Sequence, residues 1–212
     1  MKIIIYSLIL SLICFQPIIC SNKVLKSSLP VLFTPFKING LTFRNRICVS
    51  PMDMYTSEDG FVNDFHLGHY QSFATGGAGL VMIEGTSVSK DGRITPADNG
   101  LYNDSHIEPF ARIVKQIKKY GSVAGIQLLH SGRKGSTKIL WEGGESIDDN
   151  DGGWPTVAPS AIPYDDKQIT KVPKEATIED MEQIKKQFAE AAQRAVKAGF
   201  QVSLIKELFI KV

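Results

Sequence analysis

Polar residues follow three apolar runs of the sequence, at the point where each run ends. The stretch "ICVSPMDMYT" passes from apolar residues into Ser50 and Pro51 and then into residues 52–55. Proline cannot sit inside a central strand, so a strand must stop there. The other two groups are residues 84–87, after "AGLVMI", and residues 127–133, after "VAGI". Strand ends of this composition indicate a binding site to which several strands contribute.

Each of these residues also has a purely structural interpretation. Pro51 can end a strand and do nothing more. The amide of Gln127 carries donors and an acceptor, so it can bind a ligand, but it can equally cap a buried backbone group. Spacing alone leaves both interpretations open.

Net charge, the two neighbouring histidines and the lone cysteine argue against a nucleic-acid site, a metal site and a nucleophilic thiol. The 212 residues carry a net charge of +2, and no basic stripe indicates a nucleic-acid partner. His66 and His69 stand three apart in a predicted helix without carboxylate or cysteine partners, which favours a packing or surface role over a metal site. Cys48 lies in an apolar strand, where a lone cysteine is expected to be a small buried hydrophobe.

The first twenty residues have a different character from the rest. Lys2 precedes the apolar run "IIIYSLILSLIC", and a small residue stands at position 20. This pattern is typical of a secretory signal peptide over residues 1–20, with an uncleaved anchor as the alternative. Residues 21–31 would then be a linker, and the mature chain would enter the secretory pathway without stable membrane association.

The remaining chain alternates strand and helix signals. A hairpin is expected around Asn39-Gly40. Buried strands are predicted at residues 47–52, 78–88 and 123–129, and another strand begins near residue 200. Helices are predicted at residues 63–75, after a cap at Asp104, and at residues 177–198. In the last of these, Thr177 and Asp180 form a capping box, and the apolar face comprises Ile178, Met181, Ile184, Phe188, Ala192 and Ala195.

Strand–helix alternation of this kind implies parallel strands joined by right-handed crossovers. A doubly wound sheet and a (β/α)8 TIM barrel both fit. No G-x-G-x-x-G follows a strand, which weakens the dinucleotide-binding interpretation. In a barrel, function resides at the carboxyl ends of the strands, where the three polar groups lie.

Together these segments resemble the Old Yellow Enzyme family, the NADH:flavin oxidoreductases, and most closely its xenobiotic-reductase-like branch. The resemblance rests on five ordered blocks: "FKINGLTFRNRICVSPMDMYTSEDG", "GGAGLVMIEGTSVSKDGRITPADNGLYND", "GSVAGIQLLHSGRK", "WEGG" with "GGWPTVAPSAIP", and "EAAQRAVKAGF". It implies a (β/α)8 barrel that binds FMN, takes hydride from NAD(P)H and delivers it to a small-molecule activated alkene.

The same resemblance assigns roles to individual residues. Cofactor binding is implied for Ser50, Pro51, Met52, Asp53, Gly85 and Gln127. Gln127 would read the pyrimidine edge of the flavin, and Gly85, where the family usually has alanine, would let the backbone approach the ring. Tyr55 matches the tyrosine that faces the substrate.

Two departures qualify the resemblance. Asp53 stands where the related branch usually has cysteine. After residue 200 the chain reads "QVSLIKELFIKV" in place of the family's fourth-strand motif, so no catalytic residue is assigned. Residues 32–212 are therefore expected to form about four βα units of an incomplete barrel, because four strands of eight cannot close one. We expect this chain to be inactive as an ene-reductase; the alternative is a non-enzymatic secreted fragment that associates with itself or another chain through its open edges.

Overall fold

A parallel β-sheet forms the centre of the computed structural model, which describes residues 29–165 and 170–207. Its path is β3 (Cys48–Val49), β4 (Leu80–Ser87), β6 (Val123–His130) and β9 (Val202–Glu207), in that order, and β5 (Asn99–Gly100) pairs with the end of β4. Sequential strands are therefore neighbours, as βαβ crossovers require. The expected signal peptide, residues 1–20, and most of the expected linker lie outside the described residues.

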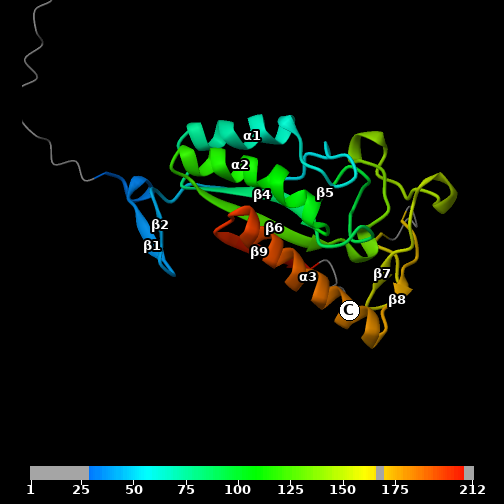
Figure 1. Ribbon diagram of the computed structural model, residues 1–212. Helices are drawn as coiled ribbons and strands as arrows, with labels where there is room; N and C mark the ends of the chain where they lie inside the picture. Colours follow the sequence, from blue (N-terminus) through cyan, green and yellow to red (C-terminus); the bar gives the residue numbers. More distant parts are fainter. Residues whose placement is uncertain (1–28, 166–169, 208–212) are drawn as a thin grey trace, which may run out of the picture.

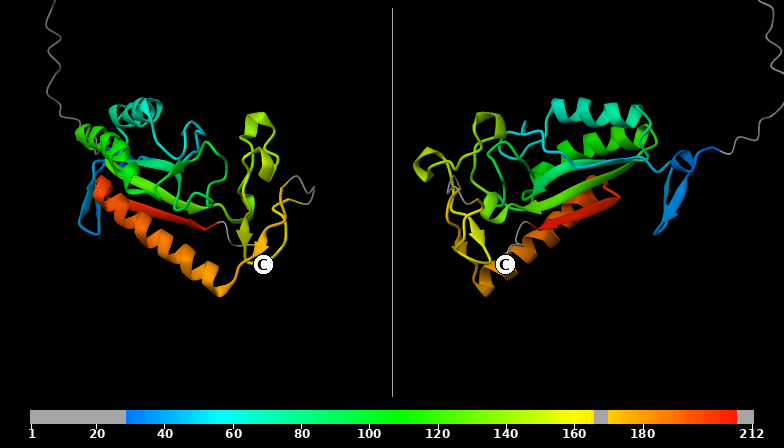
Figure 2. Two further views of the ribbon diagram at one scale, coloured as in Figure 1. Left: turned by 45° about the vertical axis from the view of Figure 1, so that its right-hand side comes forward. Right: turned by 180° about the vertical axis from the view of Figure 1, so that it is seen from behind.

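Three helices pack against this sheet (Figure 1): α1 (Asp64–Thr75), α2 (Ile107–Lys119) and α3 (Ile178–Ala198). Figure 2 shows α1 and α2 side by side and α3 running beside β9. One buried cluster joins the layers, with contributions from Ile83 of β4, Ile126 of β6, Phe110 of α2 and Ala195 of α3. β4 and β6 are buried on both faces, which confirms the prediction made from their near-continuous apolar runs.

Local signals placed two of the helix starts correctly. The α3 capping box is formed, with Asp180 N donating to the Thr177 hydroxyl at 3.1 Å and Thr177 N donating to the Asp180 carboxylate at 2.9 Å. The helix predicted at residues 63–75 is α1, and its cap is Asn63. The cap expected at Asp104 was wrong, because Asn103 accepts the hydrogen bond from Ser105 N and a short 3₁₀ turn precedes α2.

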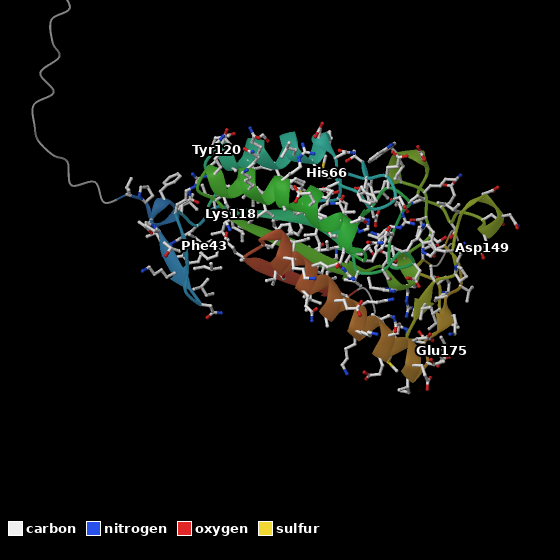
Figure 3. The ribbon with its side chains drawn as sticks, viewed as in Figure 1. Phe43, His66, Lys118, Tyr120, Asp149 and Glu175 are labelled. Atoms are coloured by element: carbon white, nitrogen blue, oxygen red, sulfur yellow. The ribbon has the colours of Figure 1, made fainter. Side chains whose placement is uncertain are left out.

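The predicted hairpin is β1 (Phe36–Ile38) paired antiparallel with β2 (Leu41–Phe43). Asn39 and Gly40 both have positive φ, 45° and 81°, as a two-residue type I′ turn requires. Phe36 and Phe43 stack across the pair at 4.6 Å. Figure 3 labels Phe43 at the hairpin and His66 at the far end of α1, so the hairpin lies away from the carboxyl ends of the strands.

The first strand of the sheet is less buried than its sequence suggested. β3 is short and lies at one edge of the sheet, and Cys48 is exposed, so the prediction of a buried cysteine was wrong. The apolar face expected for α3 is buried only in its second half. Ala195 is buried, and Phe188 and Ala192 pack against the core, whereas Ile178 is 68% exposed and Met181 is 47% exposed. The helix packs chiefly against α2 and β6.

Loops and short elements gather at the carboxyl ends of the strands (Figure 1). They include the parallel pair β7 (Val157–Ala158) and β8 (Lys174–Glu175) and the 3₁₀ turns η2 (Asp104–His106), η3 (Gly132–Lys134), η4 (Leu140–Glu142) and η5 (Asp149–Asp151); η1 (Val31–Phe33) precedes the hairpin. None of the helices in the described ranges is both long and apolar enough to cross a bilayer.

Candidate functional site

Three of the residues singled out by sequence lie in one row across the carboxyl-terminal halves of the strands. The Oδ1 atom of Asp53 accepts a hydrogen bond from Gly85 N at 2.9 Å. Gly85 of β4 is in turn the register partner of Gln127 of β6. The sheet therefore brings together Asp53, Gly85 and Gln127 from segments far apart in sequence.

The side-chain amide of Gln127 makes no hydrogen bond with any described residue, although only 7% of the residue is exposed. This observation argues against the purely structural interpretation, in which the amide caps a buried backbone group. A nearly buried amide normally has a partner. Gln127 thus presents donors and an acceptor that are available to a ligand at the carboxyl end of the sheet.

Residues 50–55 follow β3 without regular secondary structure, and Asp53 within them belongs to this row. Ser50 is exposed, Pro51 is half-buried and Met52 is 53% exposed. An exposed methionine at a strand end is a soft apolar surface on which a planar ligand can rest. These three residues directly precede Asp53 in the chain and make no hydrogen bond to Gly85 or Gln127, so their part in cofactor binding stays a prediction.

Tyr55 ends the segment in an unusual conformation. Its φ is +52°, in the left-handed region that non-glycine residues seldom adopt, and strain of this kind concentrates at functional sites. Its ring meets the Trp141 ring edge-on at 5.8 Å. Burial, then the nearby carboxylates of Asp53, Asp98 and Glu84, raise the pKa of Tyr55 to about 12, so its hydroxyl stays protonated and can donate. Tyr55 also lines a hollow of about 220 Å³ with Ile94, Lys134, Leu140 and Tyr164.

Glu84 belongs to the second of the three polar groups, but the sequence assigned it no individual role. It lies where the β4–β6 register shifts, between Ile83 and Gly85, and a bulge there redirects its side chain. Its Oε1 accepts from Met54 N at 3.0 Å, and its Oε2 accepts from the Tyr70 hydroxyl of α1. A carboxylate interrupting an apolar strand was the available signal, because an acid is almost never fully buried unless it is paired.

Burial dominates the electrostatics of this group. It raises the pKa of Glu84 to about 7 and lowers the pKa of His66 to about 4. The 3.8 Å approach between His66 Nε2 and Glu84 Oε1 therefore joins a neutral imidazole to the acid and is no ion pair at neutral pH. The ring of His66 bonds to Thr56 and to the α1 cap Asn63.

A second buried acid, Asp98, shapes the loop beside the site. Its carboxylate accepts from Ile94 N at 2.6 Å and from Thr95 N at 3.0 Å, which closes a tight turn. Burial raises the pKa of Asp98 to about 6. Nothing in the local sequence marked this residue, because its burial depends on the surrounding loops.

The two histidines of α1 have packing roles. His66 is fully buried, and His69 stacks on Phe65 at 5.8 Å and meets Phe73 edge-on at 4.8 Å. In the described part of the chain, no group of three histidine, cysteine or acidic residues is placed to hold a metal ion.

Comparisons with known proteins give independent information on this site. The sequence model of the NADH:flavin oxidoreductase / NADH oxidase family matches residues 31–207. Over 174 residues the chain is 43% identical to the NADH:flavin oxidoreductase FG08077 of Gibberella zeae, covering 81% of this chain and 42% of that protein. It is 42% identical over 173 residues to the NADPH dehydrogenase of Bacillus subtilis, covering 81% of this chain and 46% of the relative. The chain therefore spans less than half the length of these relatives.

Solved structures agree on the fold. The crystal structure of Old Yellow Enzyme from Pichia sp. AKU4542 superimposes with a TM-score of 0.70 at 27% identity, covering 82% of this chain and 45% of that one. The sheet and its helices thus correspond to part of a TIM barrel, and the predicted fold class, an incomplete barrel preceded by a hairpin, is confirmed.

Proposed function

The chain belongs to the NADH:flavin oxidoreductase / NADH oxidase family, and we propose that its strand ends form part of the flavin site of an ene-reductase. FMN with NAD(P)H as reductant, expected from the sequence, are the cofactors of this family. When bound, the flavin would relay hydride from NAD(P)H to an activated alkene. The observation that carries the proposal is the unpartnered amide of Gln127 in the row with Gly85 and Asp53.

The residues present fit a flavin. The Gln127 amide can donate to a ring carbonyl and accept from a ring N–H, which neither a carboxylate nor an ammonium could do alone. Met52 and Pro51 offer an apolar surface beside it, and Ser50 completes the segment. Next to Gln127 in the row lie Gly85 and Asp53, and the Asp53 carboxylate fills the space beside the glycine.

Other residues of this chain would act on the substrate. We assign substrate contact to Tyr55, whose raised pKa keeps its hydroxyl as a donor at neutral pH. The Trp141 ring packs on Tyr55 and would limit access of water to that side. In this scheme Tyr55 orients an oxygen atom of the substrate and transfers no proton.

A flavin titration tests the proposal. Purified chain is added to FMN and quenching of flavin fluorescence gives the dissociation constant. We expect Gln127→Glu to weaken binding about tenfold, since the carboxylate cannot donate to a ring carbonyl. Gln201→Glu is the matched control, because Gln201 precedes β9 at the opposite end of the sheet. No quenching by the wild-type chain, or equal losses in both variants, would contradict the proposal.

We further propose that these 212 residues alone do not reduce alkenes, because they span less than half of the related enzymes. Proton delivery by a general acid typically contributes about 10²–10⁴-fold to a rate, and no residue here is assigned that role. Reduction of cyclohexenone by NAD(P)H with the purified chain would show the opposite.

A second candidate function is association without catalysis, and the exposed edge of the sheet favours it. Ile205 of β9 is 60% exposed, and it borders an apolar groove of about 610 Å³ with Met181, Ile184 and Phe188 of α3. Apolar edges of this kind promote pairing between chains. Sedimentation should then show a dimer or larger species that Ile205→Lys converts to monomer; a wild-type monomer would exclude self-association.

Export remains a separate proposal. The apolar run of residues 1–20 supports a secretory signal, so the mature chain should begin near Ser21. N-terminal sequencing of protein from its native source decides the matter, and an intact Met1 in the cytosolic fraction would refute it.

A further inference from the structure

The carboxylate of Glu84 connects three parts of the molecule that are remote in sequence. It belongs to β4, it accepts from Met54 N at 3.0 Å in the segment after β3, and it accepts from the Tyr70 hydroxyl in α1. Glu84 is 1% exposed and Tyr70 is 2% exposed, so both contacts are shielded from water. A hydrogen bond to a charged group is strongest where solvent does not compete.

The 50–55 segment depends on such contacts because it has no regular secondary structure. Two hydrogen bonds tie it to β4: Met54 N to Glu84, and Gly85 N to Asp53. They fall on adjacent residues of the segment and on adjacent residues of the strand. The bulge at Glu84 makes this possible by re-aiming one side chain while Gly85 keeps its place in the register.

Tyr70 fixes the orientation of this carboxylate. Its hydroxyl donates to Glu84 Oε2 and accepts from Glu84 N at 3.0 Å, so it is hydrogen-bonded to both the side chain and the backbone of the same residue. Burial, first among several causes, raises the pKa of Tyr70, so the phenol keeps its proton at any pH the protein experiences. Rotation of the Glu84 carboxylate would break the bond to Tyr70 or the bond to Met54.

We propose that Glu84 and Tyr70 are positioning residues for the 50–55 segment, acting through Met54 N to hold the surface on which the flavin rests. Neither residue touches the ligand in this arrangement. The part of the inference that concerns flavin rests on the function proposed above, whereas the part that concerns the segment does not.

If Glu84 only stabilised the fold, Met54 would be affected no more than other residues. A dependence of the Met54 hydrogen bond on pH distinguishes positioning of the segment from a general contribution to stability. The charged groups that face Glu84 are Asp53 from the segment and Asp98 from the loop before β5, and His66 and Tyr70 face it from α1. Burial sets the pKa of Glu84 to about 7, so its charge changes within the accessible range. The ionised form makes the stronger bond to Met54 N.

Amide hydrogen exchange, resolved to Met54 by NMR, tests the inference without any ligand. The protection of Met54 is expressed relative to its value in the wild type at pH 6. The protection of Ile126 in β6 is followed beside it as the reporter of global stability. We expect this ratio to rise about tenfold between pH 6 and pH 8 in the wild type. It should stay flat in Glu84→Gln and fall about tenfold at pH 8 in Tyr70→Phe.

Thr86→Val is the matched control. Its hydroxyl is also buried in β4 and donates to Glu84 O at 3.0 Å, but it makes no hydrogen bond to the 50–55 segment. The ratio should change less than about twofold in this variant. A ratio that is flat with pH in the wild type, or that falls equally in Thr86→Val and Tyr70→Phe, overturns the inference. If Tyr70→Phe does not fold, the pH profiles of wild type and Glu84→Gln still decide.

Flavin affinity forms the second arm. Tyr70→Phe should raise the FMN dissociation constant about three- to tenfold at pH 8, and Thr86→Val should leave it unchanged. Failure of the wild-type chain to bind FMN would count against the proposed function alone, because the exchange experiment still reports whether Glu84 holds Met54. Normal FMN binding with unaltered Met54 exchange in both variants would count against the positioning role alone.

Discussion

The carboxylate of Asp53 occupies the space beside Gly85. Asp53 Oδ1 accepts from Gly85 N at 2.9 Å, and a Cβ placed on Gly85 would lie 2.7 Å from that oxygen and would also collide with Leu129. In the family that the sequence resembles, alanine is usual at the position of Gly85, and in the related branch cysteine is usual at that of Asp53. Gly85 and Asp53 therefore form one structural unit, in which the missing methyl group of the glycine makes room for the carboxylate.

Gly85→Ala should destabilise the protein by about 1–3 kcal/mol, because the methyl group overpacks against Asp53 and Leu129. Urea unfolding measures the change. The double variant Gly85→Ala/Asp53→Cys should lose less stability than the sum of the single variants, because Asp53→Cys removes the carboxylate that the new methyl group meets. We expect a coupling energy of about 1 kcal/mol.

Gly68→Ala provides the control for this experiment. Gly68 lies in α1 with open space around its Cβ position, so alanine there should stabilise by about 0.5–1 kcal/mol. Equal effects of Gly85→Ala in the presence and absence of Asp53 would show that Leu129 alone causes the strain.

Local signals in the sequence accounted for much of the fold. The alternation of buried strands and amphipathic helices, the Asn39-Gly40 turn and the Thr177–Asp180 box each depend on residues within a few positions of one another. The same signals placed Asp53 after β3 and Gly85 and Gln127 in the carboxyl-terminal halves of β4 and β6. The apolar pattern was enough to predict that these three residues come together, because the carboxyl ends of parallel strands meet at one edge of the sheet.

The remaining features depend on contacts between distant residues. The bulge that turns Glu84 toward Met54, 30 positions away, leaves no trace in the hydrophobic pattern. Burial of Asp98 likewise follows from loop packing. The exposure of Cys48 reflects the position of β3 at the edge of the sheet, which an apolar run cannot reveal because buried and edge strands can share one composition.

The stability of the chain should depend on pH through Glu84. Burial raises its pKa from 4.5 to about 7, so between these values the folded state binds more protons than the unfolded state. Stability from this group is full below pH 4.5 and is lost as pH rises through about 7, by at most about 3 kcal/mol. Urea unfolding at pH 5, 6, 7 and 8 should show a decline that is smaller in Glu84→Gln.

Asp98 contributes with the same sign, since burial raises its pKa to about 6. Some decline should therefore persist in Glu84→Gln, chiefly below pH 6. A profile identical in wild type and Glu84→Gln would mean that Glu84 ionises as easily in the folded chain as in the unfolded chain.

Thr177→Ala should destabilise the protein by about 1 kcal/mol, because it removes the hydroxyl that accepts from Asp180 N at the start of α3. Thr177→Ser keeps the hydroxyl and should restore most of the loss. Thermal unfolding of the three proteins provides the measurement, and equal midpoints would show that the first turn of α3 frays without consequence for the rest.

Asp53 should also influence the reduction potential of a bound flavin. Its carboxylate is held in the row with Gly85 and Gln127, where negative charge opposes the charge that a flavin gains on reduction. Asp53→Asn removes the charge and keeps an oxygen that can accept from Gly85 N, so it should raise the midpoint potential by tens of millivolts, on the order expected for a partly screened charge. Asp53→Cys should shift it in the same direction. The measurement is a redox titration of each flavin-loaded protein at neutral pH, and equal potentials in all three would show that the bond to Gly85 N turns the carboxylate away from the flavin.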